Sequence, residues 1–465
     1  MRSPGITGSS NLAKILLSTL PVPGHVKPAI SAAGKLQHAG HEVVFALPET
    51  LGLSVPADIR FVATGSANFD YEPISVNWQL KSLCNFLAEI ERNLRLVLTD
   101  WTLLQLPELR RIAAEERPDI LISDCLHVAP LIVALERGVP SATLGVTPYR
   151  NLLPGSAPVR SGWGPATSSL GCYAWDMINR LIEMRFRRIK SEIARELMQA
   201  APMLRRTISS ENLSVFGICE ELSNAYLLCS VPSLEDRPEK LMELGIKFIG
   251  PLNDVMLSPS ERVSPLLVAE MHPPLPKPQI ALVTWGTMQG DDPPPKFIEL
   301  TRKLLARSML TVVLAPPLKH REFVESMYHV EIASGHLALT DNFDDFLPKL
   351  RQADVFVSNG GFGAVKAALS LGVPIVCCGD QDDKPDVCGR VQRAGVGIGL
   401  PWYAGPEKMA RAVDEILSNG KFLKRSMQVG IELFQYESSD CLEKEIAKLV
   451  SAKSGESDAS PSPKK

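Results

Sequence analysis

A histidine and an aspartate follow two separate strand-like runs in the first half of the chain. His25 comes after the apolar run at residues 13–19, and Asp124 directly follows the run at residues 119–123. In open parallel sheets, ligands bind beyond the carboxyl ends of the strands, so both side chains are expected at that edge. A histidine held in one tautomer by a buried carboxylate is a competent general base. The pattern predicts a catalytic His25–Asp124 dyad.

Each member of this dyad also has a plainer interpretation. His25 can be a loop residue that precedes Pro28, and Asp124 can cap the next helix, which is a common position for aspartate. His127, three residues beyond Asp124, is a second candidate for the base. These alternatives remain open on the residues alone.

The second half of the chain contains a glycine-rich turn between a strand-like run and a helix-like run. Residues 355–358 have strand character, residues 359–363 read Asn-Gly-Gly-Phe-Gly, and residues 364–371 have helical character. Glycines let backbone amides approach a ligand closely, and the free N–H groups at a helix N-terminus favour an anion. The turn therefore predicts a phosphate site, to which Thr284 to Thr287 could add donors. The alternative is a simple tight turn, because neither GxGxxG nor GxxxxGK[ST] is present.

Strand-like and helix-like runs alternate in both halves, as in doubly wound parallel sheets. The strand-like runs are residues 13–19, 42–47, 119–123, 140–144, 226–230, 246–250, 279–284, 310–314, 337–339, 355–358 and 375–378. The first half adds long amphipathic helical stretches at 75–116 and 177–203. We therefore expect an α/β protein with a domain at 1–250, a proline-rich linker at 251–278, a second domain from 279 to 427 and a disordered tail at 451–465.

Length and composition narrow the class of protein. The 465 residues exceed what one core usually supports, and the net charge of -3 lacks the basic surplus that nucleic-acid binding requires. The nine cysteines are scattered without a CxxC pair, and no apolar run is long enough for a transmembrane segment. We predict a cytoplasmic protein without nucleic acid as a partner. The aspartate pairs at 291–292, 344–345 and 382–383 lack ligand-like spacing, so no metal site is predicted.

Several motifs together carry a resemblance to a known family. Residues 353–363, 368–376, 382–385 and 394–398 read ADVFVSNGGFG, ALSLGVPIV, DDKP and AGVGI, and this order resembles the C-terminal signature of UDP-dependent family 1 glycosyltransferases. The match is nearest to the macrolide-type and fungal or actinobacterial members that have Asn-Gly-Gly. Residues 23–28 with 40–43 (PGHVKP and GHEV) look like the N-terminal signature of the same family, and residues 248–251 (FIGP) look like its end-of-domain element.

The resemblance implies a GT-B architecture and an inverting reaction. Two Rossmann-like domains would face each other across a cleft, and a C-terminal helix at 428–450 would cross back to the first domain. His25 would deprotonate an acceptor hydroxyl, Asp124 would orient His25, and no metal or other cofactor would be needed. The donor-binding residues that the resemblance implies are Thr287, Phe343, Asn359, Gly360, Gly361, Gly363, Asp383 and Lys384.

The sequence departs from the family pattern at several donor positions. Asn359 stands where the family usually has histidine, Ala364 where it has a phosphate-binding Ser or Thr, and Ala367 where it has a ribose-binding Glu. Lys384 replaces the Gln that usually follows Asp383. For Phe343, which matches the family's base-stacking aromatic, burial in the core is the alternative. Each replacement removes a donor or an acceptor from the expected donor site.

The expected function is transfer of a hexose from a UDP-sugar, with UDP-glucose as the expected donor, to a hydroxyl of a small lipophilic acceptor such as a polyketide, terpenoid, sterol or phenol. Aromatic residues that could line an acceptor cleft, although core packing is the alternative for each, are Trp78, Phe86, Trp101, Trp163, Tyr173 and Trp175. Two other functions remain open. One is a non-catalytic subunit that activates another glycosyltransferase, and the other is a nucleotide-sugar epimerase.

Overall fold

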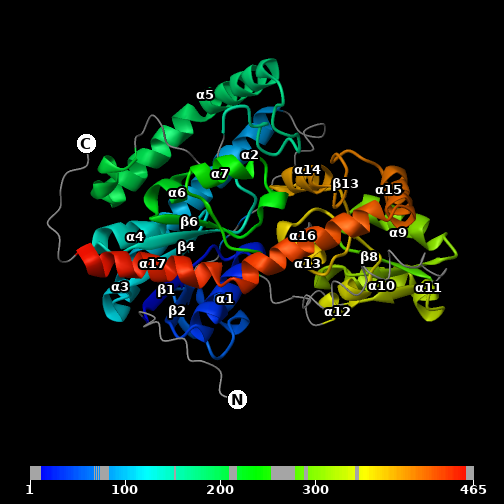
Figure 1. Cartoon of the computed structure of the whole chain (residues 1–465), viewed down its shortest axis with the longest axis horizontal. Coiled ribbons are helices and arrows are strands. Elements are labelled where there is room, and N and C mark those ends of the chain that lie inside the picture. Colours follow the sequence, from blue (N-terminus) through cyan, green and yellow to red (C-terminus); the bar gives the residue numbers. More distant parts are fainter. Residues whose placement is uncertain are drawn as a thin grey trace.

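The structure is a computed structural model. It describes residues 12–66, 69, 71, 73, 83–150, 153–208, 217–252, 278–286, 292–340 and 345–456. Two parallel sheets form the centres of two α/β domains, which lie side by side along the long axis of the molecule (Figure 1).

In the described part of the chain, the first sheet has seven parallel strands in the order β3-β2-β1-β4-β5-β6-β7. The strands are β1 (Lys14–Ser18), β2 (Glu42–Leu47), β3 (Arg60–Ala63), β4 (Ile120–Asp124), β5 (Ser141–Gly145), β6 (Ala225–Leu228) and β7 (Lys247–Phe248). The helices are α1 (Pro23–His38), α2 (Leu83–Arg95), α3 (Trp101–Glu116), α4 (Ala129–Arg137), α5 (Ser169–Ala200), α6 (Ile218–Leu222) and α7 (Pro238–Glu243). One turn of π-helix, η3 (Leu96–Asp100), joins α2 to α3, and short 3₁₀ turns are η1 (Glu49–Ser54), η4 (Pro202–Arg206) and η5 (Pro232–Leu234).

Alternating side chains of the first sheet fill two cores. Ile15 and Leu17 of β1 pack into the core that includes α1, whereas Leu16 packs into the core on the opposite face with α3 and α4. Successive side chains of a strand point to opposite faces, and a sheet covered on both faces needs apolar residues at every position. This explains why the strand-like runs are continuous rather than alternating.

The second sheet has six parallel strands in the order β10-β9-β8-β11-β12-β13, again within the described residues. The strands are β8 (Gln279–Val283), β9 (Leu310–Leu314), β10 (Leu337–Leu339), β11 (Val355–Ser358), β12 (Ile375–Cys377) and β13 (Gly397–Gly399). The helices are α9 (Pro295–Leu305), α10 (Arg321–Met327), α11 (His329–Ala333), α12 (Phe346–Gln352), α13 (Phe362–Ser370), α14 (Lys384–Ala394) and α15 (Pro406–Ser418), with the 3₁₀ turn η6 (Leu318–His320). The predicted pair of doubly wound parallel sheets is confirmed.

Two C-terminal helices bridge the domains. Helix α16 (Lys421–Ser438) packs along α13, and α17 (Cys441–Glu456) packs on α1 of the first domain, so the pair crosses the whole molecule (Figure 1). Leu442 and Ile446 of α17 are buried in the core of the first sheet, and Lys35 of α1 forms an ion pair with Glu437 of α16, with 2.5 Å between Nζ and Oε1. The C-terminal residues therefore belong to both domains.

Four boundaries differ from the sequence-based prediction. The segment before Pro28 was predicted to be a loop, yet α1 begins at Pro23, because proline has no N–H to lose in the first turn of a helix. The single crossing helix at 428–450 is two helices, separated at Ser439 and Asp440, where Asp440 has a left-handed φ of 52°. Residues 451–456 of the predicted tail continue α17. Strands β3 and β13 were not predicted.

Other predicted segments lie outside the described residues. They are residues 253–277 of the linker, residues 457–465 of the tail, Thr287, Phe343 and Trp78, as well as the side chain of Phe86. Among the residues that are described, no helix combines the length and the apolar character needed to cross a membrane. The described cysteines are all free thiols.

Candidate active site

His25 and Asp124 meet at the carboxyl edge of the first sheet. Asp124 is the last residue of β4, and His25 lies in the first turn of α1, which follows the neighbouring strand β1. The distance from Nδ1 of His25 to Oδ2 of Asp124 is 3.2 Å. The His25 side chain is 13% exposed and that of Asp124 is 1% exposed, so the ring reaches solvent while the carboxylate does not. The structure therefore brings the two predicted residues together.

Three donors hold the Asp124 carboxylate in place. Oδ2 accepts hydrogen bonds from the hydroxyl of Thr19 at 2.5 Å and the amide of Leu20 at 2.6 Å, and Oδ1 accepts one from the amide of Leu126 at 2.7 Å. Burial by itself raises the pKa of Asp124, but the charge of His25 and the hydrogen bonds outweigh burial and hold the pKa below its ordinary value. Asp124 is thus a fixed negative charge beneath the His25 ring.

His127, the second candidate for the base, has a different environment. Its side chain is fully buried, and neither ring nitrogen has a hydrogen-bond partner within the described residues. Burial lowers the pKa of His127 to about 4, although the nearby charge of Asp124 acts in the opposite direction. The ring is neutral at pH 7 and closed off from an acceptor, so the geometry favours His25.

Cys125 completes a group of metal-ligand types with His25 and Asp124. Among the residues that the structure describes, these three bring one ligand-type atom each within 4.8 Å of one another. Burial raises the pKa of the Cys125 thiol to about 11, which keeps the sulfur protonated, and Asp124 already accepts three hydrogen bonds. A cysteine binds a metal as its thiolate, so metal binding by this group would require the buried thiol of Cys125 to lose its proton.

The glycine-rich turn joins β11 to α13 in the second domain. Gly360 has a φ of +85°, and a Cβ there would lie 2.9 Å from Sγ of Cys388, so this position requires glycine. A Cβ on Gly363 would meet no atom within 4 Å, and one on Gly361 would meet only Asn359. Within the described residues, no side chain caps the N-terminus of α13. Uncapped first amides of a helix are donors that an anion could bind.

Asn359 fixes this turn to the end of β8. Its side-chain amide donates a 2.6 Å hydrogen bond to the carbonyl of Trp285, and a Cβ on Gly286 would lie 2.8 Å from the same amide nitrogen. The predicted approach of residues 284–286 to the glycine-rich turn is thus present. Asn359 is buried, and its side-chain amide is hydrogen-bonded to the backbone of Trp285. In this structure Asn359 therefore holds the turn in position.

Asp383 and Lys384 lie at the start of α14, beside the same turn. A Cβ on Gly360 would lie 3.2 Å from the carbonyl oxygen of Lys384. The Asp383 carboxylate is 3.8 Å from a guanidinium nitrogen of Arg150 in the first domain. The pair that the family resemblance implies for sugar binding is therefore close to the glycine-rich turn and also faces the first domain.

Sequence reasoning missed Lys366, which connects the two halves of the site. This lysine of α13 is 1% exposed, and its Nζ donates a 2.6 Å hydrogen bond to the carbonyl of Cys229, the residue that follows β6. Burial raises the pKa of the Cys229 thiol to about 12, and both the Lys366 cation and the Asp124 carboxylate act on that thiol. The glycine-rich helix therefore lies against the same sheet edge as Asp124. The signal in the sequence that could have revealed this contact was a lysine within the largely apolar run 364–371, because a buried lysine needs a hydrogen-bond partner.

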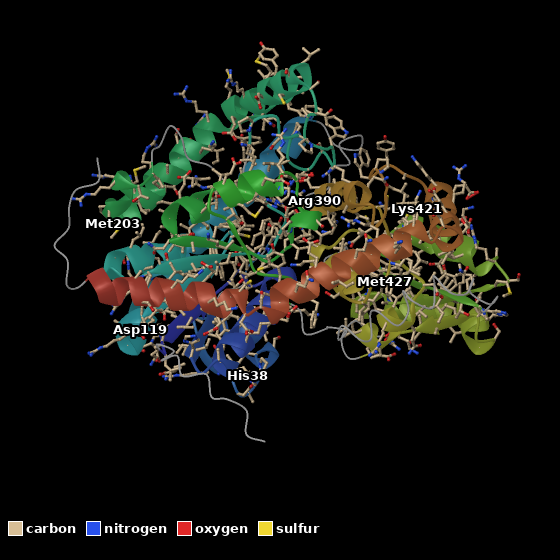
Figure 2. All side chains as sticks on the ribbon, in the orientation of Figure 1. His38, Asp119, Met203, Arg390, Lys421 and Met427 are labelled. Carbon is tan, nitrogen blue, oxygen red and sulfur yellow. The ribbon has the colours of Figure 1, made fainter. Side chains whose placement is uncertain are left out.

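Ion pairs join the two domains next to the glycine-rich turn and α14. Arg393 of α14 binds Asp236 of the first domain through two hydrogen bonds of 2.8 and 2.9 Å, and Arg390 reaches Glu235 at 3.3 Å. Arg390 lies between the two domains in Figure 2. A cavity of about 60 Å³ opens next to it, lined by both domains through Arg150, Trp163 and Asp386 among others.

The predicted acceptor aromatics divide into core and surface. Trp101 is 2% exposed and packs edge-on against Phe69 in the core of the first domain, which contradicts an acceptor-lining role for it. Trp163 stacks on Trp175 with ring centroids 5.2 Å apart, next to the cavity. Tyr173 is 64% exposed on α5.

Two named proteins are similar in sequence to this chain over most of its length. No family model matches the chain. The chain is 25% identical over 416 residues to 4'-demethylrebeccamycin synthase of Lentzea aerocolonigenes, covering 88% of this chain and 93% of that protein. It is 24% identical over 468 residues to UDP-glycosyltransferase 2 of Phaeomoniella chlamydospora, covering 92% and 93%.

Solved structures of glycosyltransferases have a similar fold over nearly the full length of this chain. The glycotransferase of kitacinnamycin has a TM-score of 0.64 at 19% identity, covering 94% of this chain and 99% of that one. The spinosyn rhamnosyltransferase SpnG, complexed with spinosyn aglycone, has a TM-score of 0.62 at 16% identity, covering 94% and 99%. With two parallel-sheet domains and similarity to glycosyltransferases over most of its length, the chain is a glycosyltransferase enzyme with the GT-B fold.

Proposed function

We propose that this enzyme transfers a hexose from a UDP-sugar to a hydroxyl of a small lipophilic acceptor, with inversion at the anomeric carbon. The observation that carries the proposal is the hydrogen bond from Lys366 of α13 to Cys229, which brings α13 to the sheet edge where His25 and Asp124 lie. Of the two half-sites, one is the His25–Asp124 pair, and the other is the open N-terminus of α13, held to the same edge by Lys366. Sugar transfer needs a base that deprotonates the acceptor and a site that binds the departing diphosphate. In this proposal the first domain supplies the base and the second domain supplies the diphosphate site.

The first half-site supplies proton transfer. Because Nδ1 of His25 lies 3.2 Å from Asp124, the other ring nitrogen, Nε2, is the one left for the acceptor hydroxyl. As the acceptor oxygen bonds to the anomeric carbon, its proton passes to Nε2 while the bond from that carbon to the phosphate oxygen breaks. The resulting imidazolium is stabilised by the Asp124 carboxylate. Attack opposite to the leaving diphosphate inverts the configuration.

The second half-site stabilises the leaving diphosphate. The amides that follow Gly361 and Gly363, together with the helix dipole, would bind negative charge, and each such donor commonly contributes about 3 kcal/mol. Asp383 and Lys384 would contact the sugar hydroxyls. The roles of Thr287 as a phosphate donor and Phe343 as a base-stacking residue are part of the same proposal. No metal or other cofactor takes part in it.

Named relatives support the substrate classes. Over 114 residues the chain is 40% identical to UDP-glucosyltransferase A1 of Starmerella bombicola, with 24% of this chain and 23% of that protein aligned, which supports UDP-glucose as the donor. The rebeccamycin and spinosyn names of other relatives support a natural-product acceptor. The Trp163–Trp175 stack beside the cavity is a lipophilic surface of the required kind. A cytoplasmic location and the Asn-Gly-Gly subgroup remain predictions.

Product analysis tests the proposal. The full chain is incubated with UDP-α-glucose and a panel of lipophilic hydroxyl compounds, and products are analysed by mass spectrometry and proton NMR. We expect UDP release that depends on the acceptor and a β-glucoside as product. An α-glucoside would refute inversion, and equal UDP release without any acceptor would refute transfer to a hydroxyl compound.

A further inference from the structure

Helix α5 exposes a large apolar stripe along its first half. The helix rises along the top edge of the molecule, and many of its side chains project outward there (Figures 1 and 2). Leu170 is 79% exposed, Met184 is 70% exposed and Leu181 is 60% exposed. Exposed large apolar side chains in the same half of α5 are Leu170, Tyr173, Met177, Ile178, Leu181, Ile182 and Met184. A contiguous patch of this kind is typical of a binding surface.

The spacing places these side chains on the outer side of the helix. Positions 170, 173, 177, 181 and 184 recur every three or four residues, so they form one stripe along a 3.6-residue helix. The polar side chain of Asn179 instead points inward, where it is buried and donates a 2.8 Å hydrogen bond to the carbonyl of Ser156. The apolar stripe therefore faces solvent although the helix has an inner face available.

Arginines flank the stripe. Arg180 lies beside the stripe in the first half of α5, and Arg185, Arg187 and Arg188 follow directly after Met184; all four are exposed. Arg185 pairs with Glu91 and Arg188 with Glu192, whereas Arg180 and Arg187 form no ion pair among the described residues. An apolar stripe with arginines on its flanks is the pattern of a helix that lies in the interface of an anionic membrane.

Trp163 and the cavity lie on the other side of α5. Trp163 is 59% exposed, stacks on Trp175 and lines the cavity beside Arg150 and Arg390. Trp175 is two positions from both Tyr173 and Met177, so it lies across the helix from the stripe, on the side of Asn179. Within the stripe itself, Tyr173 is the residue that favours the headgroup region of a bilayer, because its apolar ring and its polar O–H are both satisfied there.

We propose that this surface docks on an anionic lipid bilayer. The α5 face consists of Leu170, Tyr173, Met177, Leu181 and Met184, together with the four arginines. Docking sinks the apolar stripe into the headgroup boundary while the arginines contact lipid phosphates.

Vesicle co-sedimentation of the full chain tests the docking without any sugar donor. We expect binding to vesicles of equal parts phosphatidylcholine and phosphatidylglycerol, and weak binding to phosphatidylcholine alone. Leu181→Glu or Met184→Glu is expected to lower the partition coefficient about tenfold, since each places a charge in the apolar boundary. Arg180→Glu with Arg187→Glu is expected to lower binding to the anionic vesicles by at least about tenfold.

Leu318→Glu is the matched control. Leu318 is 81% exposed, like Leu170, but it lies in η6 of the second domain, so this variant is expected to bind as the wild type does. Circular dichroism confirms that each variant is folded. Absence of wild-type binding to anionic vesicles, or an equal loss in Leu318→Glu, would overturn the proposal. A further contrary outcome is self-association. If the wild type failed to bind vesicles but formed an oligomer without lipid, and if Leu181→Glu broke that oligomer in sedimentation velocity, the stripe would bind a second copy of the chain instead of a bilayer. A wild-type protein that transfers glucose but does not bind anionic vesicles would overturn the docking and leave the proposed function intact.

Discussion

One carboxylate serves two histidines, and burial gives the two rings different properties. His25 is 13% exposed with Nδ1 against Asp124, whereas His127 is 1% exposed and has no partner for either ring nitrogen among the described residues. A buried imidazole without hydrogen bonds is held neutral, because its charged form would lose hydration. The same sequence neighbourhood therefore yields one ring fit for proton transfer and one that is inert at pH 7.

The neutral state of His127 makes stability depend on pH. Its pKa is about 4 in the folded protein against an ordinary value of 6.5, so protons bind the unfolded chain more tightly. Stability is therefore complete above pH 6.5 and falls as the pH drops toward 4. Between pH 7 and pH 4 we expect the wild type to lose about 3 kcal/mol more than His127→Leu, measured by urea unfolding. Parallel stability curves for the two proteins would contradict this.

At the scale of single elements, the donors of the proposed diphosphate site are backbone amides at the N-terminus of α13. Gly360 turns the chain through a positive φ, and Gly361 and Gly363 leave space where side chains would otherwise stand. In the proposal, amides rather than side chains supply the donors, so Ala364 in place of the family's usual Ser or Thr is compatible with diphosphate binding. Asn359 contributes by holding the turn against Trp285.

A charge at Gly363 tests this element. Gly363→Asp places a carboxylate in the open space before α13, and we expect it to weaken UDP binding about tenfold through repulsion of the diphosphate. Gly363→Ala is the control, since a Cβ there meets no atom within 4 Å and φ is not in the left-handed region. Isothermal titration with UDP measures both. An unchanged affinity in Gly363→Asp would place the diphosphate elsewhere.

At the scale of the whole molecule, the two domains are joined by more than the chain between the sheets. Lys366 bonds to the first domain, Arg393 pairs with Asp236, and α17 packs into the first core. The C-terminal helices thus make each domain part of the packing of the other. This arrangement keeps α13 at the sheet edge where His25 and Asp124 lie.

Ile446→Ala tests the contribution of α17. Ile446 is fully buried in the core of the first domain, so truncation is expected to lower the free energy of unfolding by about 3 kcal/mol. Leu423→Ala on α16 is the control, because Leu423 is 40% exposed and should change stability by less than about 0.5 kcal/mol. Urea unfolding measures both variants. Equal effects would mean that α17 does not belong to the first core.

Local patterns predicted the two sheets and the meeting of His25 with Asp124, but not the contacts between the domains. The strand runs could be recognised because a doubly covered sheet buries every residue, and Asp124 because it ends such a run. The start of α1 was missed because the prolines near His25 look like a loop. The Lys366–Cys229 and Asp383–Arg150 contacts could not be predicted, since they join residues far apart in the sequence and depend on how two finished domains pack.

The turnover number of His25→Ala at saturating donor and acceptor tests the central claim most directly. His38→Ala is the control, because it changes an exposed histidine at the other end of the same helix (Figure 2). Loss of the base is predicted to lower kcat by roughly 10²- to 10⁴-fold, with UDP affinity and the kcat of His38→Ala unchanged. Full turnover by folded His25→Ala would contradict the account, because the acceptor proton would then have to leave without the imidazole.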